Sequence, residues 1–369
     1  MLVYGNKQHI KNGVGSETGM GKNRKTLPRN FDELIEAGDI SALKELFTRC
    51  ELDARGGYSK STALSFNLSN EMVCWLVEQG ADINAKDSYG RTALHKHAMS
   101  WWGNTELLLE LGADIEALDY QNETPLFAAA GSFKPNAVHT LVVKGADLSE
   151  KNKMNLTPLE KALANCRNID IVNMAEVADV LLNAGATVTE KMKESIKRIG
   201  NEFEFYRDGF NKEYLNQTDE ALYRLYELFG VPPVGKRKTH DGTSPITVST
   251  KGWQAQHNEL WNLLIPSQGH ANTVQGEVIR ITGKVSYEVL DNGGINWDNH
   301  FRQMLNHLHH YVSLGTPLQP AALQEVATLA KKLHKGHGTD EPARLCEMTV
   351  QWVLSNPNPI TMEQPDYKR

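Results

Sequence analysis

A group of ionisable side chains lies in the last third of the chain, where the sequence predicts a helix from Thr273 to Leu290. Glu277 and Arg280 are three residues apart on that helix, and Asp298 and His300 follow it. A carboxylate beside a histidine could act as a general acid and base. Residues three apart on a helix also form ion pairs, which is the commoner role. Because no nucleophile accompanies these groups, we predict no catalytic residues; an enzyme or ligand site at these four residues is the alternative.

Histidines gather just after this point, and His307 and His310 share one face of a second predicted helix, from Trp297 to Leu314. Two histidines from one helix can supply two ligands to zinc. The sequence offers no HExxH or comparable acidic spacing to complete the set. We therefore predict no metal and no cofactor, and interpret the histidines as surface or partner contacts. The cluster comprises His300, His307, His309, His310, His334 and His337.

Composition narrows the class of protein. The chain has 369 residues, a net charge of -6 and four widely spaced cysteines without a CxxC pair, which fits a reducing compartment. No apolar run approaches the ~20 residues of a membrane helix, and the N-terminus lacks the apolar core of a secretory signal. Basic residues occur only in short patches, which argues against nucleic-acid binding. We expect a cytoplasmic protein with neither a membrane nor a nucleic acid as partner.

Two short signatures recur in phase between residues 31 and 190. Thr-Ala/Pro-Leu begins at Thr62, Thr92, Thr124 and Thr157, with spacings of 30, 32 and 33 residues. Gly-Ala-Asp/Thr follows at Gly80, Gly112, Gly145 and Gly185. In each unit the Thr is placed to cap a first helix, and the Gly to end a second helix in the left-handed conformation. The period and the phase predict a solenoid of stacked helix pairs.

These signatures resemble the ankyrin repeat, whose pattern runs Asp-x-x-Gly-x-Thr-Pro-Leu-His-x-Ala, a turn, a second helix and Gly-Ala-Asp. Residues 87–98 match the pattern best. Two later repeats have Asn122 and Asn155 where the family has the hairpin Gly, and Asn tolerates positive φ. An insertion from Asn165 to Asn173 predicts a longer loop between the helices of the fourth repeat.

In the rest of the chain, the positions of Pro and Gly and the spacing of apolar residues predict further helices. Two helices, 188–203 and 218–229, would cap the array. Five more, 253–264, 273–290, 297–314, 320–333 and 342–354, would form a small bundle. The predicted fold class is all-α, an ankyrin-repeat solenoid followed by a small helical bundle. The predicted segments are a flexible basic tail 1–28, the array 29–190, a helical cap 191–230, a linker 231–251, the bundle 252–357 and a tail 358–369.

From Lys191 onward the chain also resembles the tail of a group of bacterial ankyrin-repeat proteins associated with toxin-immunity loci. The similar stretches are residues 203–207, 240–246, 275–283 and 293–298. This resemblance implies a cytoplasmic immunity protein that neutralises a cognate toxin. It assigns no activity to the tail.

The ankyrin resemblance further implies a protein partner, bound by the hairpin tips and the concave face of the first helices. The positions carried over by phase are Ser88, Tyr89, Arg91, Met99, Ser100, Tyr120, Gln121, Glu123, Gly131, Ser132, Lys153, Met154 and Leu156. Trp101 and Trp102 occupy the place where the family usually has a small turn, and we predict them as contacts as well. Of the two tryptophans we expect one to be an exposed anchor and the other to pack into the neighbouring repeat. The predicted function is non-enzymatic protein binding, with an effector activity in the C-terminal bundle as the alternative. The oligomeric state stays open, and the tail helices could form a homodimer.

Overall fold

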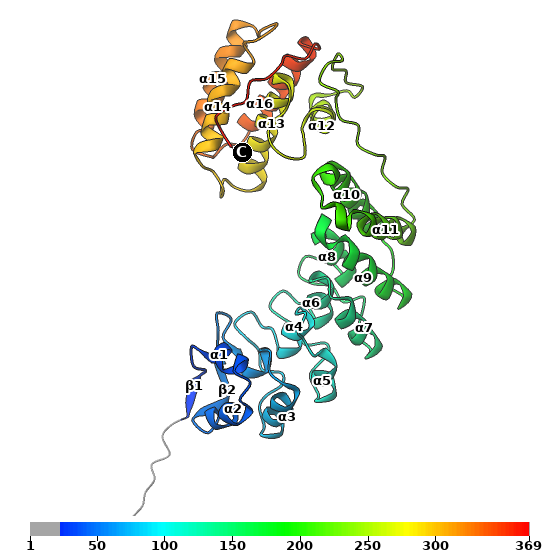
Figure 1. The fold of residues 1–369 in the computed structure, drawn as a ribbon, viewed down its shortest axis with the longest axis vertical. Helices are drawn as coiled ribbons and strands as arrows, with labels where there is room; N and C mark the ends of the chain where they lie inside the picture. The colour runs from blue at the N-terminus through cyan, green and yellow to red at the C-terminus, as the bar shows by residue number, and fades with distance from the viewer. Residues whose placement is uncertain (1–22, 369) are drawn as a thin grey trace, which may run out of the picture. The chain divides into compact units, whose positions relative to one another are not determined.

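The computed structural model describes residues 23–368, and the chain divides into two compact units (Figure 1). The first unit runs to Asn165 and includes Asn173–Val188; the second takes Cys166–Val172 and everything from Thr189 onward. Helices dominate both units, which confirms the all-α fold class. Residues 1–22, most of the predicted basic tail, lie outside the described residues.

The first unit is a row of helix pairs (Figure 1). The first members of the pairs are α1 (Phe31–Glu36), η1 (Ala63–Ser65), α4 (Ala93–Ala98), α6 (Pro125–Gly131) and α8 (Pro158–Asn165). The second members are α2 (Ile40–Leu46), α3 (Asn70–Glu78), α5 (Thr105–Glu110), α7 (Pro135–Val143) and α9 (Ile171–Asn183). Helices α4, α6 and α8 pack side by side, and α5 packs on α7. Each first helix therefore finds its apolar neighbours in the adjacent repeats.

The recurring signatures form the core and the turns of this stack. The Leu of every Thr-Ala/Pro-Leu is buried, at Leu64, Leu94, Leu126 and Leu159. At the hairpin position Asn122 and Asn155 both have φ of 57°, which confirms that Asn replaces Gly with its geometry kept. The capping prediction holds only in part: Thr157 accepts the Glu160 N–H at 3.3 Å, whereas the buried Thr124 hydroxyl has no hydrogen-bond partner among the described residues.

Two features at the N-terminal end differ from the prediction. Residues Arg24–Thr26, expected in the flexible tail, form strand β1, which pairs in parallel with β2 (Cys50–Gly56). Strand β2 in turn pairs antiparallel with β3 (Ser61–Thr62). The first helix of the second repeat shrinks to the single 3₁₀ turn η1. Backbone hydrogen bonding along β2 thus orders a segment whose composition alone favours a solvated chain.

Gly90 is the tightest point of the hairpins. Its φ is +79°, and a Cβ there would lie 2.6 Å from Cδ1 of Tyr120 and 2.9 Å from the Tyr120 backbone nitrogen. We expect Gly90→Ala to lower the free energy of unfolding by about 2 kcal/mol or more, through strain and this clash. Gly112, at φ +92° with no atom within 4 Å, is the matched control. Gly112→Ala should cost only the strain, about 1 kcal/mol in urea unfolding; equal losses would contradict the clash.

The second unit is mainly helical. Its elements are α10 (Glu190–Tyr206), η3 (Arg207–Gly209), α11 (Lys212–Phe229), α12 (Trp253–Leu264), α13 (Val274–Ser286), η4 (Tyr287–Asp291), α14 (Asn299–Tyr311), α15 (Pro320–Leu333) and α16 (Glu341–Ser355). The bounds of α12 and α15 are those predicted, while α14 is shorter than 297–314. The predicted helix 273–290 is α13, which changes to the π-helix η4 at Tyr287. No helix among the described residues is long and apolar enough to cross a membrane.

Two segments predicted as linker and tail are attached to the bundle. Within 231–251, Arg237 donates to the carbonyl oxygens of Asn262, at 2.7 Å, and Ile265. In the C-terminal segment, Ile360 accepts the Val274 N–H at 2.9 Å. Tyr367 is 1% exposed. Contacts of Ile360 and Tyr367 therefore attach the segment 358–368, predicted only as a tail, to the bundle, although most of its other residues are exposed.

Candidate functional site

The hairpin tips of the repeats are held by one acidic or amide side chain each. Asp87 Oδ1 accepts the backbone N–H of Tyr89 at 2.8 Å and of Arg91 at 2.9 Å. Asp119 and Asn152 hold the next two tips by equivalent pairs of bonds. The sequence analysis did not predict that these three residues hold the tips, although each lies five residues before the Thr of its Thr-Ala/Pro-Leu signature. The side chains at each tip are consequently presented on a fixed backbone.

Successive tips are also bonded to one another. Tyr120 N–H donates to the Tyr89 carbonyl at 3.0 Å, and Lys153 N–H donates to the Gln121 carbonyl at 2.9 Å. A second ladder joins the turns that enter the hairpins: the N–H of Asp114 donates to Asn84 Oδ1 at 2.9 Å. The tips of neighbouring repeats therefore form one continuous surface.

Large apolar side chains follow this surface from repeat to repeat. Tyr58 is 93% exposed, Tyr89 43%, Tyr120 60% and Met154 74%. We call these four residues the tip row. The sequence analysis did not predict Tyr58 as a contact. Its position could have indicated it, because Tyr58 precedes Thr62 by four residues, as Tyr120 precedes Thr124. Exposed tyrosines on a rigid backbone are typical anchors of protein interfaces.

Two of the predicted contact residues are buried and cannot contact a partner in this conformation. Leu156 is 5% exposed and Glu123 is 7% exposed. Glu123 forms an ion pair with Lys161 and accepts a hydrogen bond from Asn152 Nδ2 at 2.9 Å. Glu123 thus links its repeat to the next one, whereas the backbone of Leu156 is bonded to Asn152 within its own hairpin. Of the other predicted contacts, Ser88, Gln121 and Lys153 are exposed, whereas Arg91, Met99, Ser100, Gly131 and Ser132 are half-buried.

The tryptophan pair stands at the other end of α4, in the turn before α5. Trp101 is 71% exposed, and the Lys134 ammonium lies 3.3 Å from its ring centroid. Trp102, 42% exposed, packs edge-on against His97 with centroids 4.8 Å apart. Trp102 therefore packs against a histidine of its own repeat, and Trp101 contacts the next repeat through Lys134.

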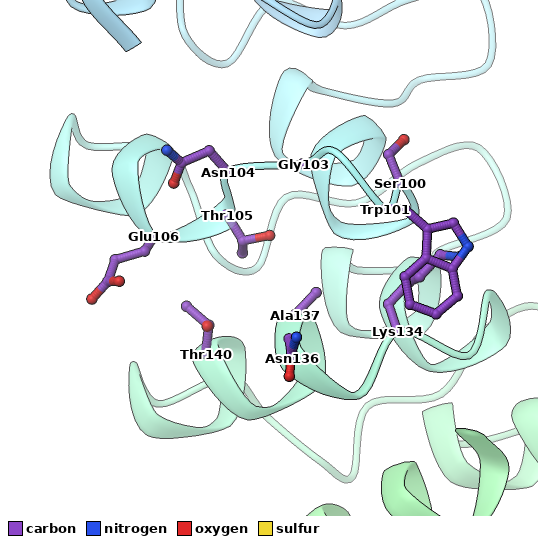
Figure 2. A pocket seen from close by; sticks show the side chains of 10 residues that line it. All are labelled: Ser100, Trp101, Gly103, Asn104, Thr105, Glu106, Lys134, Asn136, Ala137 and Thr140. Atoms are coloured by element: carbon purple, nitrogen blue, oxygen red, sulfur yellow. The ribbon is translucent and has the colours of Figure 1, made fainter. Parts of the chain in front are cut away.

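Beside Trp101 lies a shallow groove of about 250 Å³ between the α5 and α7 segments (Figure 2). Trp101 and Lys134 lie together at one end of it, and Glu106 and Thr140 stand at the other. Its lining is mostly polar, from Ser100, Asn104, Thr105 and Asn136. Such a groove can receive a side chain of a bound protein, but it is too open and polar to enclose a small ligand.

Two buried histidines on α4 connect three consecutive repeats. His97 Nδ1 accepts the Asn104 N–H at 3.0 Å, so Nε2 carries the proton and donates to the Leu64 carbonyl of the preceding repeat at 3.0 Å. His95 likewise accepts the Thr92 N–H at Nδ1 and donates to the Glu123 carbonyl of the following repeat at 2.9 Å. Burial lowers the pKa of His97 to about 4 and lowers the pKa of His95 as well. Each imidazole accepts one hydrogen bond and donates another, so the folded array requires both histidines in the neutral form.

The alternative C-terminal site does not assemble as predicted. Glu277 and Arg280 are both fully buried and paired, with Arg280 Nε 2.8 Å from Glu277 Oε2. Tyr367 donates to Glu277 Oε1 at 2.7 Å, and the Ala271 N–H donates to Oε2 at 3.1 Å. Burial on its own raises the pKa of the Glu277 carboxyl, but the bonds and charge of Arg280, with these two donors, outweigh it and lower that pKa. The carboxylate is therefore held ionised as a structural group.

Asp298 and His300 lie at the N-terminal end of α14. Asp298 Oδ1 caps α14 by accepting the His300 N–H at 2.9 Å, and His300 Nδ1 lies 3.4 Å from the Lys368 backbone nitrogen. His307 faces Asp366 at 3.6 Å. Within residues 23–368 no group of three or more His, Cys, Asp or Glu is arranged to hold a metal ion. Glu277 and Arg280 thus form a buried ion pair on α13, whereas Asp298 and His300 lie at the start of α14.

The comparisons with known proteins concern the repeats. Residues 61–152 match the family model for ankyrin repeats (3 copies). An ankyrin repeat protein of Variola virus is 33% identical over 104 residues, which are 27% of this chain and 18% of that protein. The B-cell lymphoma 3 protein homolog of Mus musculus is 38% identical over 127 residues, 33% of this chain and 28% of that protein. The chain thus spans less than a third of either relative, and its ankyrin repeats are matched by the family model over residues 61–152.

Proposed function

We propose that this protein is a non-enzymatic binding protein whose ankyrin array holds one protein partner through the tip row and the adjoining faces of α4, α6 and α8. The observation that carries the proposal is the exposure of Tyr58, Tyr120 and Met154 on hairpins fixed by inter-repeat hydrogen bonds. A rigid scaffold lowers the entropy lost on binding, and aromatic anchors supply most of the affinity in such interfaces.

The finer part of the proposal concerns the partner. The resemblance of the segment from Lys191 onward to ankyrin proteins of toxin-immunity loci supports a cytoplasmic immunity protein that neutralises a cognate toxin. Co-expression with the products of neighbouring genes tests this directly. One product should be toxic alone and harmless with this protein, and the two should co-purify; if no neighbouring product is toxic or bound, the immunity role is wrong.

Replacing the tip anchors should abolish most binding to the partner obtained in that way. We expect Tyr58→Ala and Tyr120→Ala each to weaken binding by at least about 2 kcal/mol, because each removes an exposed ring that becomes buried in the complex. Isothermal titration calorimetry of the full chain measures the change.

The matched control is Tyr223→Ala on α11, since Tyr223 is 59% exposed and lies outside the array. It should leave affinity unchanged, and circular dichroism should show all three variants folded. Loss of binding in the Tyr223 variant with retention in the tip variants would place the interface in the second unit and refute the proposal.

A further inference from the structure

Basic and acidic residues of the array are distributed unevenly between the segments of the first helices and those of the second helices. The segments with the hairpin tips and first helices, residues 56–70, 86–100, 118–132 and 151–165, hold seven basic and four acidic residues. The basic ones are Lys60, Lys86, Arg91, Lys96, Lys151, Lys153 and Lys161. The segments with second helices α3 and α5, residues 71–85 and 101–117, hold seven acidic residues and no Lys or Arg, and residues 133–150 are balanced. The tip side is thus positive in a chain whose net charge is -6.

The acidic residues of the tip side are turned inward. Asp87, Asp119 and Glu123 are buried at 4%, 6% and 7% exposure. Each faces a cation of the array: Lys96 lies 3.5 Å from Asp87, Arg91 lies 3.5 Å from Asp119, and Lys161 pairs with Glu123. The fourth, Glu160, accepts the Thr157 N–H at 3.0 Å in a helix cap. What a partner meets on this side is therefore the positive charge.

Exposed lysines stand beside the apolar side chains of the tip row. Lys60 follows Tyr58 by two residues, and Lys153 precedes Met154; both lysines are exposed. Neither ammonium forms an ion pair with another residue in the part of the chain that the structure describes. Unpaired surface cations next to apolar anchors complement a surface that offers carboxylates around apolar side chains.

From this distribution of charge we infer that the partner presents an acidic segment with interspersed apolar residues, and that this segment lies along the tip row. The inference rests on the proposed function and names the chemistry of the partner. A protein fits better than a nucleic acid because the acidic second helices and the net negative charge would repel a long polyanion. Attraction by the lysines would speed association and would weaken as salt rises.

The test uses the full chain and three labelled probes in fluorescence anisotropy at about 50 mM and about 200 mM salt. The probes are a peptide alternating Glu/Asp pairs with Leu and Phe, the same peptide with Lys at every acidic position, and a single-stranded oligonucleotide. We expect the acidic peptide to bind, more weakly at the higher salt, and the basic peptide not to bind. Equal binding of both peptides would overturn the inference, and tighter binding of the oligonucleotide would assign the tip side to nucleic acid instead.

Charge-reversal variants locate the binding. Lys60→Glu with Lys153→Glu should weaken binding of the acidic peptide by about tenfold or more at low salt. Glu78→Lys with Glu110→Lys changes two exposed residues of the second helices by the opposite charge and should not weaken it. An unchanged affinity in the tip variant, or an equal loss in both variants, would contradict the inference. If the natural partner is lost with Tyr120→Ala but unaffected by the lysine reversals, the proposed function stands and only the acidic character of its partner is wrong.

Discussion

Lowering the pH from 7.5 to 5 is expected to destabilise the repeat array by about 2 kcal/mol, through His97 alone. The folded array needs a neutral His97, whose pKa burial lowers from 6.5 to about 4, whereas the unfolded chain takes up the proton near 6.5. Between these values the unfolded state binds more protons, so stability is fully present above pH 6.5 and falls with the pH. His95, whose pKa is also lowered by burial, adds to the loss.

The geometry explains why no simple rearrangement avoids this loss. A proton on His97 Nδ1 would face the Asn104 N–H at 3.0 Å, so a hydrogen bond would be replaced by a repulsive contact. Urea unfolding followed by hydrogen exchange in peptides from residues 61–152 separates the array from the bundle. His97→Gln should be less stable at pH 7.5 but should lose much of the pH dependence. His139→Ala, an exposed histidine on α7, should change neither; a His97→Gln variant with the wild-type pH slope would refute the assignment.

Removing the Glu277 carboxylate should destabilise the second unit by about 3–5 kcal/mol, because Glu277→Ala leaves the Arg280 guanidinium buried with its charge uncompensated. Both side chains have no exposed surface. The Tyr367 hydroxyl and the Ala271 N–H would also lose their acceptor, so the C-terminal segment should loosen from α13. Urea unfolding followed by hydrogen exchange in peptides from residues 274–286 and 358–368 measures both effects.

Two further variants should lose less stability than Glu277→Ala and provide the comparison. Tyr367→Phe removes one hydrogen bond to a charged group and should cost about 1.5–3 kcal/mol. Glu347→Ala removes a partly exposed partner of Arg344, 2.7 Å away, and should cost less than about 1 kcal/mol. A Glu277→Ala variant no less stable than Glu347→Ala would show that the buried pair contributes nothing. Replacing the pair with Leu and Met together should recover stability, since no charge is then left buried alone.

Repeat architecture was predictable because it depends on local and periodic features. The Thr-Ala/Pro-Leu signatures set where first helices begin, and the buried Leu64, Leu94, Leu126 and Leu159 show that the same phase builds the core. Asn122 and Asn155 could be assigned positive φ from residue type alone. The bounds of α12 and α15 followed from prolines and glycines at their ends in the same way.

The candidate surface was predictable only in part. Phase placed Tyr89, Tyr120 and Met154 on the hairpin tips, but it could not separate them from Glu123 and Leu156, which are buried in the folded array. Whether a position one residue from the tip faces solvent depends on what the next repeat presents, here Lys161 and Asn152 against Glu123. Tyr58 was missed because its repeat has only a shortened first helix.

The sequence by itself determined the repeat period, the helix order and the positions of the hairpin tips, because each depends on residues close together in the chain. Only the tertiary structure decided which of these residues are exposed, that His95 and His97 connect three repeats, and that Tyr367 completes the buried pair of Glu277 and Arg280. Those outcomes depend on contacts between segments that are distant in sequence, and 90 residues separate Glu277 from Tyr367. Desolvation then fixes the charge state of each buried group.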